Sequence, residues 1–373
     1  MDIFDTARLY DSLQVMEREQ DPLGREERLK AMEKPLLAWY GSRARSLPWR
    51  DDPKPYRVWI SEIMLQQTRV EAVKPYFERF MKAFPGVRDL AGAEDDHLMK
   101  MWEGLGYYNR ARNLKAAARM VMEEYGGCLP ASFEELIKLP GIGSYTAGAI
   151  ASIAFGVPVP AVDGNVLRVI SRVTASREDI AAPACKKAME QQMRDIIPAD
   201  RAGDFNQSLM ELGAMVCLGN GEPKCLVCPL REICEGFRQG IAGELPVKAP
   251  KKPRKREEKT VLILHCGERF ALRQRPKKGL LAGMWELPWL EGFWEQDALR
   301  NQLEKQGAQV LSIRPLAPSR HIFTHVEWHM QGWAVELETP LADYIWADSQ
   351  TMGEQYALPS AFKGYFGELG IGK

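Results

Sequence analysis

The 373-residue sequence has no long apolar run and no surplus of charge of one sign. No apolar stretch approaches the roughly 18 residues that a membrane span needs, so we expect no membrane partner. The N-terminal segment MDIFDTARLYDSLQVMEREQD has acids where a secretory signal would have basic and then apolar residues, which predicts a cytoplasmic, nucleoid-associated protein of bacterial type. Fifty Lys and Arg residues balance fifty Asp and Glu residues, so the total charge does not indicate an acidic partner.

Cysteine is also sparse, with seven residues in the chain, which argues against a disulfide framework. Cys128, Cys185 and Cys266 stand alone, and we interpret them as buried small apolar residues. Hydrophobic residues make up 45% and charged residues 27%, the balance of a folded protein, so global disorder and fibrous repeats are excluded. At about 150 residues per domain, the length predicts two or three domains.

Helical periodicity dominates the chain up to about residue 240. Apolar residues recur every three or four positions in 57–84 and 98–126, and Pro and Gly interrupt the pattern. The segment PVKAPKKPRKREEK (246–259) then has seven basic residues and three prolines, which is typical of an extended linker. Beyond it, strand-like runs at 308–314, 320–330 and 332–338 and a helix at 295–307 predict a separate α+β domain.

The segment LPGIGSYTAGAIAS (139–152) has the pattern of a helix-hairpin-helix turn. Gly141 and Gly143 permit a tight turn, and the helix that follows begins with free backbone N–H groups, which bind a DNA phosphate well. Ser144 adds a hydroxyl donor beside them. The alternative is an ordinary glycine-rich turn between two core helices.

Asp163 precedes Gly164 and an amphipathic run in AVDGNVLRVISRV (161–173), so it is an N-cap candidate for the N–H of Val166. The helix dipole and the capping N–H groups favour the ionised form of this carboxyl, so we expect it to stay charged. An ionised carboxylate can stabilise a sugar cation or attack it. The alternative is a helix cap with no catalytic role.

Glu62 lies among apolar residues in WISEIMLQQTRV (59–70). A carboxyl in an apolar helix setting has a raised pKa and can donate a proton near neutrality. The alternative is a Glu that simply faces solvent. Gln66 and Gln67 follow it, and two adjacent amides suit hydrogen bonding to base edges.

The segment GLGYYNRARN (104–113) places Leu105, Tyr107 and Tyr108 beside Arg110 and Arg112. Apolar and aromatic wedges between basic residues are what a protein that unstacks DNA would use. The alternative is an aromatic pair in the core.

Four cysteines, Cys217, Cys225, Cys228 and Cys234, have the spacing C-x7-C-x2-C-x5-C. Four thiolates in one short loop strongly predict a metal site. Both tetrahedral zinc and a [4Fe–4S] cluster accept four Cys, and the spacing alone does not separate them.

Taken together, these motifs resemble the helix-hairpin-helix DNA glycosylase superfamily and, within it, the MutY-type adenine glycosylases. The segments found in the family's order are SEIMLQQT, GLGYYNRARN, LPGIGSYTA, VDGNV, NQSLMELGAMVC and the four-Cys loop. The C-terminal part resembles the family's Nudix-like domain. The resemblance implies four parts: a partly helical extension (1–34), an all-α glycosylase domain (35–241, with lobes at about 50–153 and 154–241), a basic linker (242–258) and an α+β recognition domain (259–373).

The resemblance implies removal of adenine opposite 8-oxoguanine or guanine in double-stranded DNA, after the base is flipped out of the stack. Glu62 would protonate N7 of the adenine, and Asp163 would stabilise the oxocarbenium ion or form a transient covalent sugar adduct. Tyr145 and Asn165 would orient these groups. Related lyases have Lys where this chain has Tyr145, and the amine forms a Schiff base with the sugar. We therefore expect a monofunctional enzyme with no or minimal lyase activity.

The resemblance also implies a lesion-reading motif and a cofactor. Phe323, Thr324 and His325 match a Phe-Ser-His motif with Thr in place of Ser, and no acid cluster for Mg²⁺ is present, so the Nudix-like domain should recognise rather than hydrolyse. The four Cys would hold a [4Fe–4S] cluster, although their first gap has seven residues where the family has six. The expected contacts to DNA and lesion are Gln66, Gln67, Thr68, Leu105, Tyr107, Gly141, Gly143, Ser144, Phe323, Thr324 and His325.

Two other functions compete with this interpretation. One is a bifunctional pyrimidine glycosylase/lyase, which Tyr145 and Glu62 disfavour. The other is a non-catalytic mismatch-binding protein in which the carboxyls are only caps and surface groups. The basic linker is a candidate contact for a sliding clamp or another repair protein, and we expect a monomer. Because the net charge is zero, local basic patches must bind DNA, with an affinity that falls as salt rises.

Overall fold

The computed structural model describes residues 23–250 and 253–371. Residues 1–22 of the predicted extension, and Lys251 and Lys252 of the predicted linker, lie outside these ranges. The chain forms two compact units: the first contains the described residues up to 58, 131–138 and 142–249, and the second contains 59–130, 139–141 and the described residues from 250 onward. Within the described ranges, no helix is long and apolar enough to cross a membrane.

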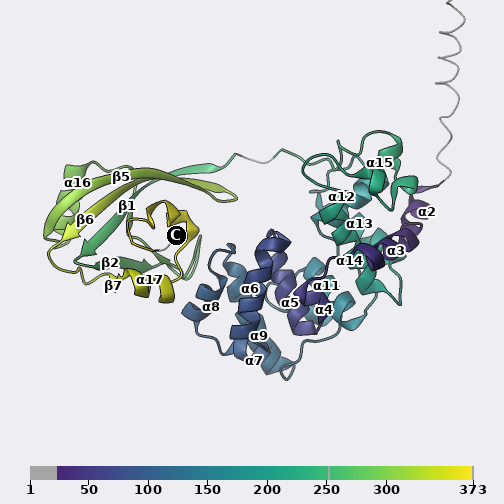
Figure 1. Ribbon diagram of the computed structural model, residues 1–373, viewed down its shortest axis with the longest axis horizontal. Helices are drawn as coiled ribbons and strands as arrows, with labels where there is room; N and C mark the ends of the chain where they lie inside the picture. The colour runs from purple at the N-terminus through teal and green to yellow at the C-terminus, as the bar shows by residue number, and fades with distance from the viewer. Residues whose placement is uncertain (1–22, 251–252, 372–373) are drawn as a thin grey trace, which may run out of the picture. The chain divides into compact units, whose positions relative to one another are not determined.

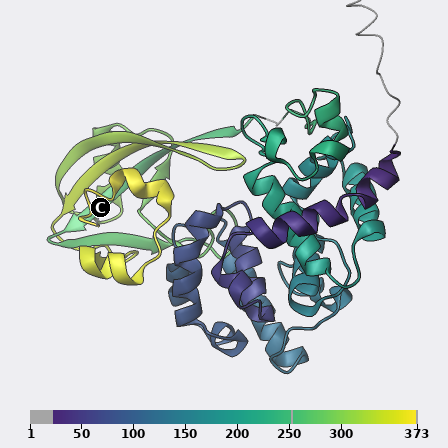
Figure 2. The ribbon, with the colours of Figure 1, turned by 45° about the vertical axis from the view of Figure 1, so that its right-hand side comes forward.

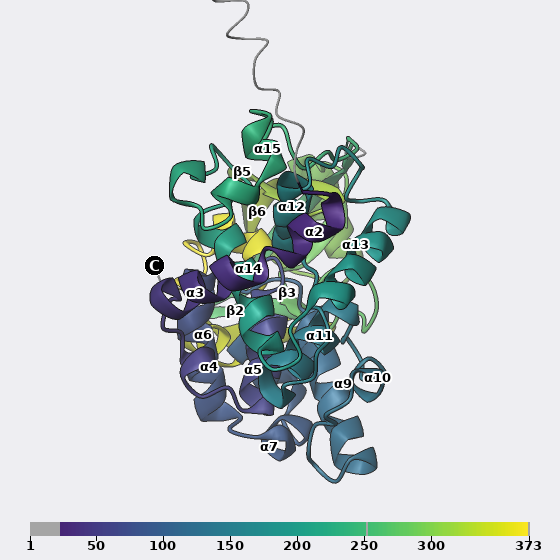
Figure 3. The ribbon, with the colours of Figure 1, turned by 90° about the vertical axis from the view of Figure 1, so that its right-hand side faces the viewer.

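The first unit is helical and packs around one apolar core. Leu29, on α2 (Arg25–Lys30), and Met32, just before α3 (Glu33–Arg43), are buried in this core with Ile170 and Phe205. Figure 3 shows α2 and α3 beside α12 (Gly164–Val173) and α14 (Ala202–Met215). The predicted domain start at residue 35 is therefore too late. The helices of this unit are α2 (Arg25–Lys30), α3 (Glu33–Arg43), α4 (Pro48–Asp51), α10 (Phe133–Leu136), α11 (Ser144–Phe155), α12 (Gly164–Val173), α13 (Pro183–Ile196), α14 (Ala202–Met215), η1 (Cys225–Val227), η2 (Arg231–Ile233) and α15 (Glu235–Arg238).

The helical part of the second unit begins within α5 (Pro55–Leu65), whose first residues belong to the first unit. The periodic segment 57–84 forms two helices, separated by a turn in which Gln67 has a left-handed backbone (φ 57°). On the second helix, Val73, Phe77 and Phe80 recur at three- and four-residue spacing and are buried. The remaining helices here are α6 (Val70–Ala83), α7 (Val87–Ala91), α8 (Asp95–Trp102) and α9 (Asn109–Glu124).

The C-terminal part of the second unit is a seven-stranded mixed sheet with the main order β3-β2-β1-β6-β5. The pair β1 and β6 is parallel and the pair β5 and β6 is antiparallel, as the curved strands of Figure 1 show. β4 pairs with β1, and β7 pairs with β2. The strands are β1 (Lys255–Cys266), β2 (Arg269–Gln274), β3 (Trp285–Glu286), β4 (Trp289–Glu291), β5 (Val310–Ile322), β6 (Val326–Leu337) and β7 (Ile345–Asp348).

Both faces of this sheet are covered, as alternating apolar residues on β1 require. Val261 and Ile263 face α17 (Ser349–Gln355) and η3 (Ser360–Tyr365), which are the yellow segments of Figure 2. Leu262 and Leu264 face α16 (Gln296–Lys305). Two sequence-based boundaries change: β1 begins at Lys255, inside the predicted linker, and a turn interrupts the predicted strand 320–330 between β5 and β6.

The isolated cysteines differ in exposure. Cys185 is buried, as predicted, whereas Cys266 is partly exposed and Cys128 is exposed. The interpretation as a buried residue is therefore wrong for Cys128, because this residue follows the turn at Gly126 and Gly127 that ends α9 at the surface.

Candidate active site and DNA interface

Asp163 is the N-cap of α12 in the first unit, as predicted. One carboxylate oxygen accepts from the backbone N–H of Val166 at 2.8 Å, and the other accepts from Nδ2 of Asn165 at 2.7 Å. The side chain is partly buried. The expected contact between Asn165 and Asp163 is therefore present, and it holds the carboxylate in one orientation.

Burial raises the pKa of Asp163 above its ordinary value, even though the hydrogen bonds from Val166 and Asn165 and the charge of Arg168 lower it. The expectation that the cap and the helix dipole would dominate is wrong. Both effects are local to α12, whereas desolvation comes from every element that packs around the carboxyl.

Two arginines on α12, which sequence reasoning missed, bind the cysteine loop, and one of them, Arg168, also contacts the Asn165 that holds this carboxylate. Nη2 of Arg168 donates to Oδ1 of Asn165 at 2.9 Å and to the carbonyl of Gly213 at 2.8 Å, while its Nε donates to the carbonyl of Cys217 at 2.8 Å. Nη1 of Arg172 donates to Sγ of Cys217 at 3.2 Å. The signal that could have found them is two arginines four residues apart inside an otherwise apolar run, where each needs a buried acceptor.

The four cysteines of the loop line one cavity, together with apolar side chains, Arg172 and Lys224. Among the described residues, no three His, Cys, Asp or Glu side chains converge closely enough to hold a single metal ion. Burial raises the pKa of Cys228 to about 12 and that of Cys234 to about 11, so a bound metal would have to displace their protons. Four thiol donors spread around a shared cavity fit an iron–sulfur cluster, which is larger than one ion.

The predicted hairpin turn leads into α11, with Gly143 as its N-cap. Gly141 has φ +79°, and a Cβ at this position would lie 2.7 Å from Cβ of Asn113, so only glycine fits without strain. Ser144 is exposed, and its hydroxyl donates to Oε1 of Glu190 at 3.4 Å. Next along α11, the hydroxyl of Tyr145 donates to Sδ of Met210 at 3.7 Å. The turn thus has the expected conformation, and Ser144 is open to a ligand.

Glu62 lies on α5 in the second unit and is 5% exposed. Its neighbours Trp59, Ile60, Ile63 and Met64 are all buried. The alternative of a solvent-facing surface Glu is therefore excluded.

The segments Gln66–Thr68 and Leu105–Tyr107 contain the expected wedge residues of the second unit. Gln67 and Tyr107 are exposed, and both have left-handed backbones, with φ 57° and 47°. Leu105 and Tyr108 are buried. Tyr107 is therefore the aromatic residue of this segment that is open to DNA, and Tyr108 is a core residue.

Arg110 and Arg112 do not form the basic flank that their spacing suggests. Arg110 is 8% exposed, and its guanidinium donates to the backbone carbonyls of Gln66, Leu105 and Gly106 in these two segments. Arg112 is partly buried and donates to Asn109 and to the carbonyl of Ala282. Both guanidinium groups are therefore engaged inside the protein.

The predicted lesion-reading motif, Phe323–His325, lies in the turn between β5 and β6. Phe323 packs edge-on against two rings, and its centroid lies 4.6 Å from that of His321 and 4.9 Å from that of Trp328. Thr324 and His325 are exposed. The hydroxyl of Tyr107 lies 3.2 Å from Oγ1 of Thr324, so two residues predicted from distant motifs meet within the second unit.

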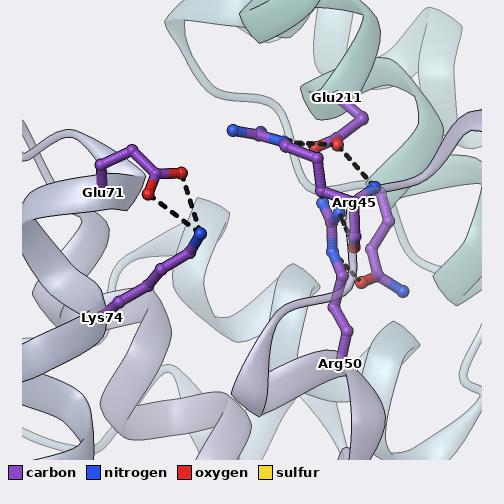
Figure 4. Close-up of polar contacts among 6 residues, drawn as sticks. Arg45, Arg50, Glu71, Lys74 and Glu211 are labelled. Carbon is purple, nitrogen blue, oxygen red and sulfur yellow. Dashed lines mark hydrogen bonds and ion pairs between the residues drawn. The ribbon is translucent and has the colours of Figure 1, made fainter.

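A buried ion network in the first unit is a further feature that sequence reasoning missed. Glu211, on α14, is 1% exposed and accepts from Arg45 at 2.7 and 2.8 Å and from Arg50 at 2.9 Å (Figure 4). Burial alone would raise the pKa of Glu211, but the hydrogen bonds from both arginines outweigh it and lower the pKa to about 2. No local pattern marks this carboxylate, because its partners are more than 160 residues away in the chain.

The glycine turn before α11, the capped aspartate at α12 and the four-Cys loop define the class as a helix-hairpin-helix DNA repair glycosylase. Residues 60–198 match the family model described as HhH-GPD superfamily base excision DNA repair protein, and residues 260–367 match the NUDIX domain. A solved structure of a thermostable thymine-DNA glycosylase is similar, with a TM-score of 0.51 and 29% identity over 57% of this chain and 97% of that chain.

The particular family follows from the relatives. The chain is 35% identical over 371 residues to the adenine DNA glycosylase of Homo sapiens, across 82% of this chain and 67% of that protein. It is 34% identical over 293 residues to the adenine DNA glycosylase of Buchnera aphidicola subsp. Baizongia pistaciae, across 78% of this chain and 82% of that protein. The chain belongs to the adenine DNA glycosylase (MutY) family, whose members are DNA-binding enzymes of base excision repair and usually carry a [4Fe–4S] cluster.

Proposed function

We propose that this protein is a monofunctional glycosylase that hydrolyses the N-glycosidic bond of adenine mispaired with 8-oxoguanine or guanine. The observation that carries the proposal is the Asp163 carboxylate, which Asn165 and the α12 N-terminus hold in one orientation. A carboxylate held in this way is the group needed to stabilise a sugar cation. The buried carboxyl of Glu62 supports the accompanying role of proton donor.

The proposed reaction has two steps. Glu62 gives its proton to N7 of the flipped adenine, the bond between C1′ and N9 breaks, and the bonding electrons leave with the base. Asp163 stabilises the resulting oxocarbenium ion or bonds to C1′ transiently. Water then adds to C1′, any bond between C1′ and Asp163 breaks with its electrons returning to the carboxylate, and the Glu62 carboxylate takes the proton that this water loses.

The absence of lyase chemistry is proposed from Tyr145. A phenol cannot form the Schiff base through which an amine at this position would lead to strand cleavage. Tyr145 lies at the start of α11, with its hydroxyl on Met210. It is therefore suited to packing beside the sugar rather than to bonding with it.

For the opposite base, the contact between Tyr107 and Thr324 supports a reading of 8-oxoguanine by both residues. The Thr324 hydroxyl offers the lesion a hydrogen bond, and the exposed Tyr107 ring offers a surface for stacking. Gln67 is exposed beside the end of α5 and offers its amide to base edges.

We further propose that Cys217, Cys225, Cys228 and Cys234 hold a [4Fe–4S] cluster rather than zinc. Such a cluster, when bound, supplies four iron–thiolate bonds that join the loop into one rigid element. Arg172 would still donate its hydrogen bond to Sγ of Cys217, which would then be one of the ligating sulfur atoms. Purified protein should contain about four iron and four sulfide per chain by this assignment; a stoichiometric zinc content with no iron would contradict it.

The test of the reaction is a single-turnover incubation with a duplex carrying adenine opposite 8-oxoguanine, analysed with and without hot alkali. Strand breaks only after alkali are expected, because base release leaves an alkali-labile abasic site. Breaks without alkali would show a lyase, and no breaks in either sample would point to a binding protein or another target base. Glu62→Gln should abolish base release and preserve DNA binding; an unchanged rate would reject the catalytic role of Glu62.

A further inference from the structure

Arg110 caps the helix that carries Glu62 from outside that helix. Its Nη1 donates to the backbone carbonyls of Ile63, Met64 and Gln66 at 2.8, 3.0 and 2.7 Å. The last carbonyls of a helix receive no hydrogen bond from an N–H group of the same helix, so they need an outside donor. A cation at this end also complements the helix dipole. Arg110, on α9, therefore secures the end of α5 and the turn that follows.

The other end of the same guanidinium holds the second wedge segment. Nη2 of Arg110 donates to the carbonyls of Leu105 and Gly106, both at 3.1 Å. Nε1 of Trp102 also donates to the Gly106 carbonyl, at 3.1 Å. The guanidinium carbon lies 5.5 Å from the ring centroid of Tyr107, within the range of a cation–π contact.

Both segments carry backbone strain next to these bonds. Gln67 and Tyr107 have φ values of 57° and 47°, which bulky residues seldom adopt and which persist only where the surroundings impose them. Both side chains are exposed. Five backbone carbonyls converge on Arg110: two from the end of α5 and three from the two segments. Burial lowers the pKa of Arg110 to about 10, which leaves it charged at neutral pH.

We propose that Arg110 is a positioning residue for base extrusion, which holds the Gln67 and Tyr107 segments as one rigid wedge. The inference rests on the proposed function, because a wedge is needed only if a base inside the duplex must be extruded. The planar fork of arginine reaches both segments at once, whereas a lysine ammonium is a compact point with three donors. Lys at this position would keep the charge and lose the connection.

The experiment compares Arg110→Lys and Arg110→Met with Arg119→Met. Arg119 is a matched control, since it lies on α9, is exposed and donates to a single carbonyl, that of Ala91, at 3.2 Å. The probe is a duplex with 8-oxoguanine opposite a 2′-fluorinated deoxyadenosine, which resists hydrolysis, and with 2-aminopurine as the neighbouring base. The fluorescence of 2-aminopurine rises when the stack opens, so it reports extrusion without chemistry.

For Arg110→Lys we expect binding within about fivefold of wild type, less than half of the wild-type fluorescence rise, and single-turnover base release slowed about 10- to 100-fold. Arg119→Met should match wild type in all three. A full fluorescence rise in Arg110→Lys and Arg110→Met, or a fall in base release that only follows a fall in the folded fraction, would overturn the inference. If Arg110→Met does not fold, Arg110→Lys decides.

The two hypotheses fail in different ways. A wild-type protein that opens the stack but releases no adenine from an ordinary substrate would overturn the proposed function. The role of Arg110 is judged separately, from the fluorescence rise of the variants relative to wild type on the non-hydrolysable duplex.

Discussion

Arg168 donates to the side-chain oxygen of Asn165 at 2.9 Å, and Asn165 in turn donates to the Asp163 carboxylate at 2.7 Å. The same guanidinium donates to the carbonyl of Cys217 at 2.8 Å. A continuous line of hydrogen bonds therefore joins the candidate catalytic carboxylate to the first cysteine of the four-Cys loop. A change in the conformation of the loop should therefore change the orientation of the Asp163 carboxylate.

Arg168→Met should slow single-turnover release of adenine about 10- to 100-fold, the usual cost of losing a residue that orients a functional group. Binding to the duplex should change much less, because Arg168 is buried. Arg177→Met is the control, since Arg177 is exposed and pairs with Glu244, which is also exposed. An Arg168→Met rate equal to that of the control would contradict the connection.

The pH dependence of base release should respond to Asn165. Asp163 must be ionised to stabilise a cation, so the rate should fall on the acid side as this carboxyl takes up a proton. Burial already raises the pKa of Asp163, and the hydrogen bond from Asn165 lowers it. Asn165→Ala removes the lowering contribution and should move the acid limb of the rate profile to higher pH. Single-turnover rates from pH 4 to 8 would measure the shift; a limb that stays in place or moves to lower pH would refute it.

Thr324 should contribute to the distinction between 8-oxoguanine and guanine. Thr324→Val keeps the shape of the side chain but loses the hydroxyl that meets Tyr107. One neutral hydrogen bond is worth about 0.5–1.5 kcal/mol, so the preference for the lesion should fall about two- to tenfold. The measurement is the ratio of base-release rates opposite 8-oxoguanine and opposite guanine. Thr324→Ser keeps the hydroxyl and should retain the wild-type ratio. Equal ratios in Thr324→Val and Thr324→Ser would argue against a role for the hydroxyl.

Glu211→Gln should destabilise the first unit by about 3–5 kcal/mol, because it leaves Arg45 and Arg50 without a buried counter-charge. In the wild type, a folded-state pKa of about 2 against an ordinary 4.5 means that ionised Glu211 stabilises the fold above pH 4.5. That contribution is lost as the pH falls from 4.5 towards 2. Urea unfolding at pH 7 and at pH 3 should show a large difference between wild type and variant at pH 7 and a smaller one at pH 3.

Glu71→Gln provides the control for this comparison. Glu71 pairs with Lys74 on the surface of α6, with its side chain 73% exposed (Figure 4), and such pairs contribute about 0–1 kcal/mol. The free energy of unfolding should therefore be nearly unchanged. A loss as large as that of Glu211→Gln would mean that burial is not what makes the Glu211 network important.

Features that depend on neighbouring residues were predictable. Asp163 caps α12 because the backbone N–H of Val166 is three residues away, and the glycine turn precedes α11 because Gly141 takes a left-handed backbone. The four cysteines share a cavity because they come from one short loop. The helical character of the first half of the chain and the α+β character of the second follow in the same way from apolar periodicity.

Which polar groups are buried, and which partners they have, follows from tertiary packing. The family motifs, the cap and the clustered cysteines can be read along the chain, since each arises within a few residues. The sequence alone did not indicate that Arg110 turns inward to join two wedge segments, that Arg45 and Arg50 enclose Glu211, or that burial raises the pKa of Asp163. Those outcomes depend on desolvation and on partners far away in the sequence, and both exist only once the helices have packed.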